Sequence, residues 1–119
     1  MSSWESVRLG GKKVELMFQS SSSGGFKIGS KYGSKDEDGY LALVKQNDVC
    51  WYQRPSDPRS VGVSNTGDVV VADWIEHGGL TDATVSVIDR DQFTVFEEHL
   101  DVPSPTVDIS PDGDFVVMC

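Results

Sequence analysis

Long apolar runs and clustered histidines are missing from this sequence of 119 residues. No apolar run approaches the ~18 to 20 residues that a helix needs to span a bilayer. The N-terminus also lacks the basic and apolar regions of a signal peptide. We therefore expect a cytoplasmic protein without a membrane partner. His77 and His99 have no metal-ligand spacing, and no cofactor is predicted.

Cysteine is scarce, with only Cys50 and Cys119 in the chain. Neither residue belongs to a Cys-x-x-Cys pair, so the sequence does not indicate a disulfide framework. Cys50 lies between Val49 and Trp51 in a strand-like run. At such a position we expect a small buried thiol.

Basic residues are few, with 10 Lys and Arg against 19 Asp and Glu and a net charge of -9. This charge disfavours a phosphate-tracking surface, so no nucleic-acid partner is predicted. The acidic residues are spread along the chain, and 13 of them are Asp. A high-salt cytoplasm would screen their mutual repulsion, and we hypothesise a halophilic source. An ordinary acidic protein kept soluble by its charge is the alternative.

Helical periodicity is almost absent, and short apolar runs alternate with Gly, Pro, Asn, Asp and Ser clusters every 8 to 12 residues or so. This spacing predicts an all-β fold. The expected strands are residues 14–18, 26–29, 40–44, 49–52, 61–63, 69–72, 84–88, 93–96, 107–109 and 115–118.

Two strand–turn–strand segments are copies of one another, VGVSNTGDVVV at residues 61–71 and VDISPDGDFVV at residues 107–117. Each copy contains a turn glycine that can adopt a positive φ. The segments before them, residues 40–52 and 85–96, agree more loosely. Four strands repeating every ~40 to 50 residues are typical of a β-propeller blade.

Residues 61–118 resemble the YVTN and NHL-like propeller repeats, through VSVID at 85–89, TVF at 94–96 and ISPDGD at 109–114. The resemblance implies antiparallel four-stranded sheets in propeller-like blades. We expect one β domain over residues 1–119, with repeat units at about 13–59, 60–105 and 106–119.

These units make an incomplete propeller, because about two and a half of them fall short of the 4 to 8 blades of a ring. The chain is then either the N-terminal piece of a longer propeller or a subunit that completes a ring as a homo-oligomer. A compact β-sandwich is the alternative fold. In the sandwich, an N-terminal strand around residues 7–9 would cover the C-terminal edge.

Trp74 follows an apolar strand and leads into an expected loop over residues 75–82. In a propeller, loops at one end of the blades form the mouth of the channel, where ligands and partners dock. Trp74, Glu76 and His77 are therefore the predicted binding residues. The alternative is that Trp74 fills the core between neighbouring sheets.

Asp36, Glu37 and Asp38 precede Gly39 and form the strongest local candidate for calcium, since hard cations take several oxygen ligands. The distal Glu of a twelve-residue calcium loop is missing, which favours a solvated acidic turn, and no metal site is predicted. The pairs Asp89 with Asp91 and Asp112 with Asp114 are expected to cap tight turns instead.

The leading functional prediction is a non-catalytic propeller-like repeat module for protein binding or scaffolding. Its partner would be another protein or a second copy of the chain. The resemblance also brings in lactonase-type hydrolases and quinoprotein-like enzymes, so a fragment or subunit of such an enzyme is an alternative. A truncated gene product is a third reading, suggested by the abrupt terminus DFVVMC. No catalytic residue is predicted.

Overall fold

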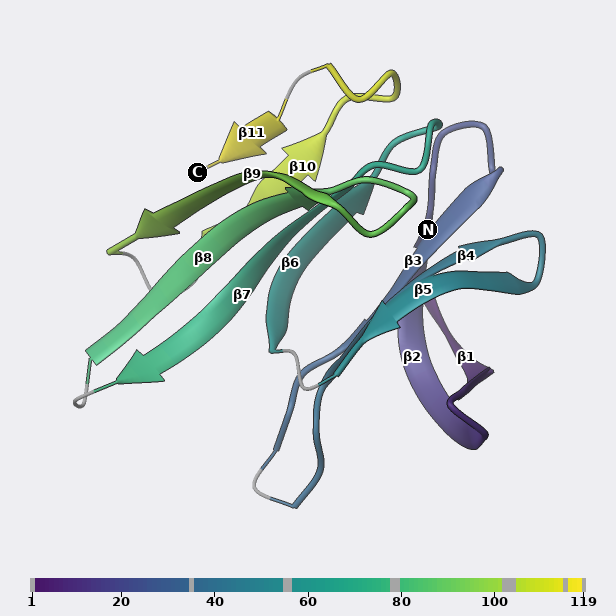
Figure 1. Ribbon diagram of the computed structural model, residues 1–119, viewed down its shortest axis with the longest axis horizontal. Helices are drawn as coiled ribbons and strands as arrows, with labels where there is room; N and C mark the ends of the chain where they lie inside the picture. The colour runs from purple at the N-terminus through teal and green to yellow at the C-terminus, as the bar shows by residue number, and fades with distance from the viewer. Residues whose placement is uncertain are drawn as a thin grey trace.

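The protein is all-β, as expected from the spacing of its apolar runs (Figure 1). A computed structural model describes residues 2–34, 36–54, 57–77, 80–101, 105–114 and 116–118. Side chains are described in these ranges except at residues 2, 75–82, 117 and 118. Within them there is no helix, and hence none long and apolar enough to cross a membrane.

The strands form three antiparallel sheets that follow one another along the chain. The first sheet consists of β1 (Ser2–Leu9), β2 (Lys12–Ser20), β3 (Phe26–Lys31), β4 (Tyr40–Lys45) and β5 (Asp48–Gln53). The second consists of β6 (Pro58–Val63), β7 (Val69–His77), β8 (Leu80–Ile88) and β9 (Thr94–Leu100). The third is the hairpin of β10 (Val107–Ile109) and β11 (Val116–Met118).

A strand occurs at each of the ten expected positions, although Phe115 of the last one lies outside the described residues. The full length of the first strand of the structure was not expected. β1 pairs with β2 from the Ser2–Gln19 pair to the Leu9–Lys12 pair. The expectation that an N-terminal strand would cover the C-terminal edge is therefore wrong. Gly10 and Gly11, with φ of 60° and 85°, make the tight turn that folds β1 back onto β2.

The second sheet lies between the other two, and its strand β7 is buried on both faces where it begins. Its strand β7 begins with four fully buried residues, Val69 to Ala72. Because side chains alternate along a strand, Val69 and Val71 pack toward the first sheet, while Val70 and Ala72 pack toward the third. The sheets thus form a layered stack with an apolar core on each side of β7.

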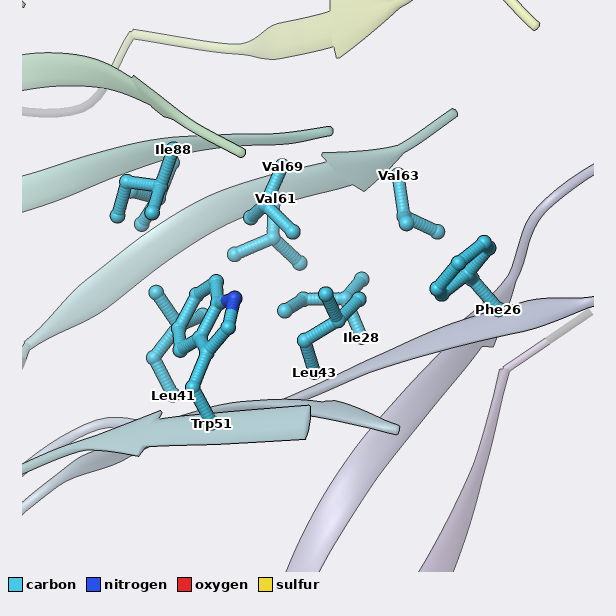
Figure 2. Packing of buried hydrophobic residues seen from close by; sticks show 10 residues of the cluster. Phe26, Ile28, Leu41, Leu43, Trp51, Val61, Val63, Val69 and Ile88 are labelled. Carbon is cyan, nitrogen blue, oxygen red and sulfur yellow. The ribbon is translucent and has the colours of Figure 1, made fainter. Parts of the chain in front are cut away.

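The core between the first and second sheets is shown in Figure 2. Trp51 of β5 lies over this core, and its indole Nε1 donates to the Asp89 carbonyl at 3.1 Å. The cluster consists of Phe26, Ile28, Leu41, Leu43, Trp51, Val61, Val63, Val69, Val71 and Ile88. This core joins the two sheets through side chains of strands β3 to β8.

The opposite face of the first sheet is covered by its own hairpin of β1 and β2. The sheet curls so that Leu9 of β1 and Leu16 of β2 pack against Tyr40 and Ala42 of β4. These side chains are nearly or fully buried. The hairpin of β1 and β2 therefore caps the stack on the side away from the second sheet.

A turn of the same type occurs once in each sheet, between β2 and β3, between β6 and β7 and between β10 and β11. In all three turns the amide of a positive-φ glycine donates to the carbonyl of a serine three residues earlier. The pairs are Gly24 with Ser21 (2.9 Å), Gly67 with Ser64 (3.2 Å) and Gly113 with Ser110 (2.9 Å). The serine-rich turn of the first sheet thus has the hydrogen bond of the two copied turns, although its sequence differs.

Successive turns also bond to each other. Oδ1 of Asn65 in the second turn accepts the Ser23 amide of the first turn at 2.8 Å. The Asn65 amide donates to the Pro111 carbonyl of the third turn at 2.7 Å. A Cβ at Gly67 would lie 2.9 Å from the Phe26 ring, so the second turn rests directly on the first sheet.

The expectation that Cys50 has a buried thiol is wrong, because this thiol is exposed. The neighbouring Trp51 points into the core, and the alternation of side chains along β5 places Cys50 on the outer face. Partial burial nevertheless raises the pKa of the Cys50 thiol above its ordinary value.

Candidate functional site

A groove of about 470 Å³ lies where the first sheet meets the start of β6. Trp4 and Met17 sit directly opposite each other on β1 and β2, which places both side chains on one face of the first sheet. The residues that line the groove are Trp4, Met17, Gln19, Ser30, Lys31, Tyr32, Pro58, Arg59, Ser60 and Val61. Trp4 and Tyr32 are 59% and 57% exposed, so large aromatic surface faces solvent here.

Arg59 of β6 is held between two aromatic rings beside this groove. Its guanidinium carbon lies 4.4 Å from the centre of the Tyr32 ring and 4.1 Å from that of the Trp74 ring. Both distances are within the range of cation–π attraction. One guanidinium nitrogen, Nη2, pairs with the Asp57 carboxylate at 3.3 Å, and the Trp74 amide donates to the Asp57 carbonyl at 3.0 Å.

Three buried polar atoms around this stack have no hydrogen-bond partner within the described part of the chain. They are Arg59 Nε, Asp57 Oδ1 and Trp74 Nε1. Leaving a buried donor or acceptor unpaired costs about 1–3 kcal/mol, so native proteins keep few such groups. All three lie on the residues that form or contact this stack.

The groove carries positive charge on an acidic protein. Lys31 and Arg59 line it, and none of its lining residues is acidic. Lys31 pairs with Glu37 at 2.7 Å, but that carboxylate lies outside the lining. Arg59 is likewise paired with Asp57 at 3.3 Å, so the groove differs from the rest of this acidic chain by its lack of acidic lining residues and not by unpaired positive charge.

Of the predicted binding residues, Trp74 is half-buried and belongs to this stack. The expected loop over residues 75–82 is wrong, because β7 continues to His77 and β8 begins at Leu80. Glu76 pairs with Thr81 and His77 with Leu80 in that hairpin. The side chains of Glu76 and His77 lie outside the described residues.

Sequence reasoning missed Arg59, Tyr32 and Trp4. They come from the start of β6, the segment after β3 and the unexpected strand β1. Nothing in their spacing indicates that they meet, since Tyr32 comes 28 positions after Trp4 and Arg59 comes 27 positions after Tyr32. The available signal was chemical: Arg59 is one of only four arginines in a strongly acidic chain.

The acidic turn considered for calcium directs its carboxylates toward separate cations. Glu37 pairs with Lys31 at 2.7 Å, and Asp38 pairs with Arg54 at 2.9 Å. The hydrogen bond and charge of Lys31 lower the pKa of Glu37. The described residues, Asp36 among them, contain no group of three or more His, Cys, Asp or Glu side chains that could hold a metal ion.

The other acidic pairs cap turns, as expected. Asp89 Oδ1 accepts the amides of Asp91 and Phe93 at 2.9 Å and 3.0 Å. Asp112 Oδ1 accepts the Asp114 amide at 3.0 Å, and this bond lowers the pKa of Asp112. These carboxylates therefore have a structural role in the turns.

Comparison of the chain with protein-family models, with curated proteins and with solved structures found no match. The candidate site is therefore defined by its geometry and chemistry alone.

Proposed function

We propose that this chain is a non-catalytic repeat module that binds a protein partner at the groove beside Arg59. The observation that carries the proposal is the guanidinium of Arg59 held between Tyr32 and Trp74 next to the exposed Trp4. Trp, Tyr and Arg are the residues that most often dominate the energy of protein interfaces. A partly ordered Arg also loses less side-chain entropy on binding than a free one.

The proposal assigns the module to an incomplete propeller of the YVTN and NHL-like type. Its support is the recurrence of one turn in three successive sheets, with Asn65 bonded to the turns on both sides. The double-faced burial of β7 also suits an inner blade, which packs against a neighbour on each face.

The same proposal places the module in the cytoplasm of an organism with a high internal salt concentration. The exposed, unpaired thiol of Cys50 suits a reducing compartment. The net charge of -9 suits a solvent in which carboxylate repulsion is screened.

The halophile proposal predicts that added salt stabilises the protein. Raising KCl from about 0.1 M to about 2 M shortens the screening length to a few ångströms and should raise the melting temperature by several degrees. Circular dichroism would follow the transition. A variant that neutralises three exposed acids, Asp48→Asn with Glu97→Gln and Glu98→Gln, should show a smaller rise. A melting temperature that stays flat or falls with KCl contradicts this part of the proposal.

The binding proposal is tested by selecting ligands for the folded chain from a displayed library of random twelve-residue peptides. Enriched peptides should combine aromatic or aliphatic residues with Asp or Glu. Trp4→Glu, which puts a carboxylate into the groove, should weaken their binding at least about tenfold. Arg90→Gln removes an exposed arginine elsewhere and should leave the affinity unchanged. Failure to enrich any peptide, or equal binding by the Trp4→Glu variant, would overturn the proposal.

A further inference from the structure

β9 is an edge strand that exposes an unusual amount of apolar surface. It is the last strand of the second sheet, and residues 94–99 are all exposed. The exposed fractions are 61% for Val95 and 42% for Phe96, and Phe93, which directly precedes the strand, is 68% exposed. Soluble proteins usually protect such edges with Lys, Pro or a covering segment, and an open apolar edge is a template for pairing.

The charges on β9 differ from the usual protective pattern. Glu97 and Glu98 follow the aromatic residues directly, so the segment FTVFEE combines apolar side chains with two carboxylates on an extended backbone. The groove beside Arg59 presents Trp4, Met17, Tyr32 and Pro58 for apolar contact. It has no acidic lining residue, and its two cations, Lys31 and Arg59, are each shared with one carboxylate, Glu37 and Asp57.

We propose that β9 of a second copy of the chain occupies this groove. The inference rests on the proposed function, because it names the partner of that same binding site. The apolar side chains of the second copy would contact Trp4 and Tyr32. Because successive side chains on a strand point to opposite faces, one of its two glutamates, Glu97 or Glu98, would lie against Lys31 and Arg59. The rest of the protein surface is acidic in both copies, so contacts between those surfaces are repulsive. Electrostatic attraction therefore favours docking at the groove.

A single copy cannot fill its own groove with its own strand. β6 lines the groove, and β9 lies at the opposite edge of the same four-stranded sheet. Three strand spacings of about 4.8 Å separate them. The groove and β9 are different surfaces, so the contact is heterologous. The groove of each copy binds β9 of one neighbour, and β9 of each copy binds the groove of another neighbour.

Direct pairing of two β9 strands is the competing arrangement. An antiparallel pair that is symmetric about Glu97 would place the two Glu97 residues opposite each other and Phe96 of each copy opposite Glu98 of the other. Like charges directly opposite destabilise a strand pair. A pair symmetric about Phe96 would instead place Glu97 opposite Val95, with no like charges facing, so the groove and strand variants below are needed to decide between the two arrangements.

Sedimentation velocity of the whole chain in about 0.15 M KCl tests the proposal, because most net-charge repulsion is screened beyond about 8 Å there. The mean sedimentation coefficient should rise with protein concentration between about 10 and about 500 µM, the range expected for an interface smaller than standard size. The groove variant Trp4→Glu and the strand variant Val95→Lys with Glu97→Lys should each weaken association at least about tenfold.

Both variants alter exposed side chains, and their far-UV circular dichroism should match that of the parent chain. Trp4→Phe keeps an apolar ring in the groove and should retain association. The control Asp48→Lys with Thr106→Lys carries the same change of charge as the strand variant at exposed sites outside β9 and should also associate.

The decisive measurement mixes the two defective variants. The groove variant still offers an intact β9, and the strand variant still offers an intact groove, so an equimolar mixture should form dimers and nothing larger. Three results would overturn the inference: a monomeric parent chain at every concentration, full association of the groove variant, or a mixture that stays monomeric. Full association of the groove variant with loss in the strand variant would identify β9–β9 pairing instead. If the parent chain is monomeric but still binds selected peptides at the groove, this inference is contradicted and the proposed function is not.

Discussion

Replacing Gly67 with alanine is expected to lower the free energy of unfolding by about 2–4 kcal/mol, measured by urea denaturation. Gly67 has a φ of 84°, a left-handed conformation that disfavours any residue with a Cβ. The added Cβ would also lie 2.9 Å from two atoms of the Phe26 ring and 3.0 Å from Cβ of Arg90. The substitution therefore strains the turn and pushes it away from the first sheet.

Gly11→Ala separates these two effects. Gly11 has nearly the same φ, 85°, but a Cβ there would meet nothing within 4 Å. It should cost only the backbone strain, about 1–2 kcal/mol. The difference between the two variants measures how tightly the second turn packs on the first sheet. Equal losses would show that the contact of Gly67 with Phe26 contributes nothing, against the stacking of turns described above.

The strands were predictable because their signals are local. Short apolar runs between turn residues specify them, and the copied turn at residues 64–68 and 110–114 has the same glycine geometry twice. Of β1, only a strand around residues 7–9 was expected, and with another partner, because SSWESVRL mixes polar and apolar residues and is exposed over most of its length. Gly10 and Gly11, between Val7 or Leu9 and Val14 or Leu16, were the available signal for this hairpin.

The candidate site was predictable only in part because it depends on contacts between distant segments. Trp74 stood out as a large aromatic at the end of an apolar strand, and it does lie at the stack. Its partner Arg59 begins a different strand, and the ring on the other side, Tyr32, follows β3. Residue type and spacing do not predict that Arg59 contacts these two rings. The contact follows from how the first sheet packs on β6.

The cap formed by β1 and β2 limits how the stack of sheets can grow. A terminal repeat in an array must cover its outer face, and here Leu9, Leu16 and Phe18 cover that face of the first sheet. A ring completed by a second copy would need this face to be free for another blade. The self-association inferred above needs only the groove and β9, which the cap leaves exposed.

Leu43→Ala should give the largest loss of stability, about 2–5 kcal/mol of unfolding free energy. Leu43 is fully buried in the core between the first and second sheets, opposite Trp51 on β5. Figure 2 shows its side chain pointing into this core beneath Ile28. Truncation leaves a cavity among side chains of both sheets, so the loss should affect both sheets together.

Urea denaturation followed by tryptophan fluorescence and by far-UV circular dichroism checks this cooperation, since coincident curves indicate one transition. The exposed Val95→Ala is the matched truncation outside the core and should change stability by no more than about 0.5 kcal/mol. A loss below about 1 kcal/mol for Leu43→Ala would mean that the contact between the sheets is loosely packed. Two separate transitions would mean that the sheets unfold independently, and the groove between them would then lack the rigid frame that holds Arg59 between its two rings.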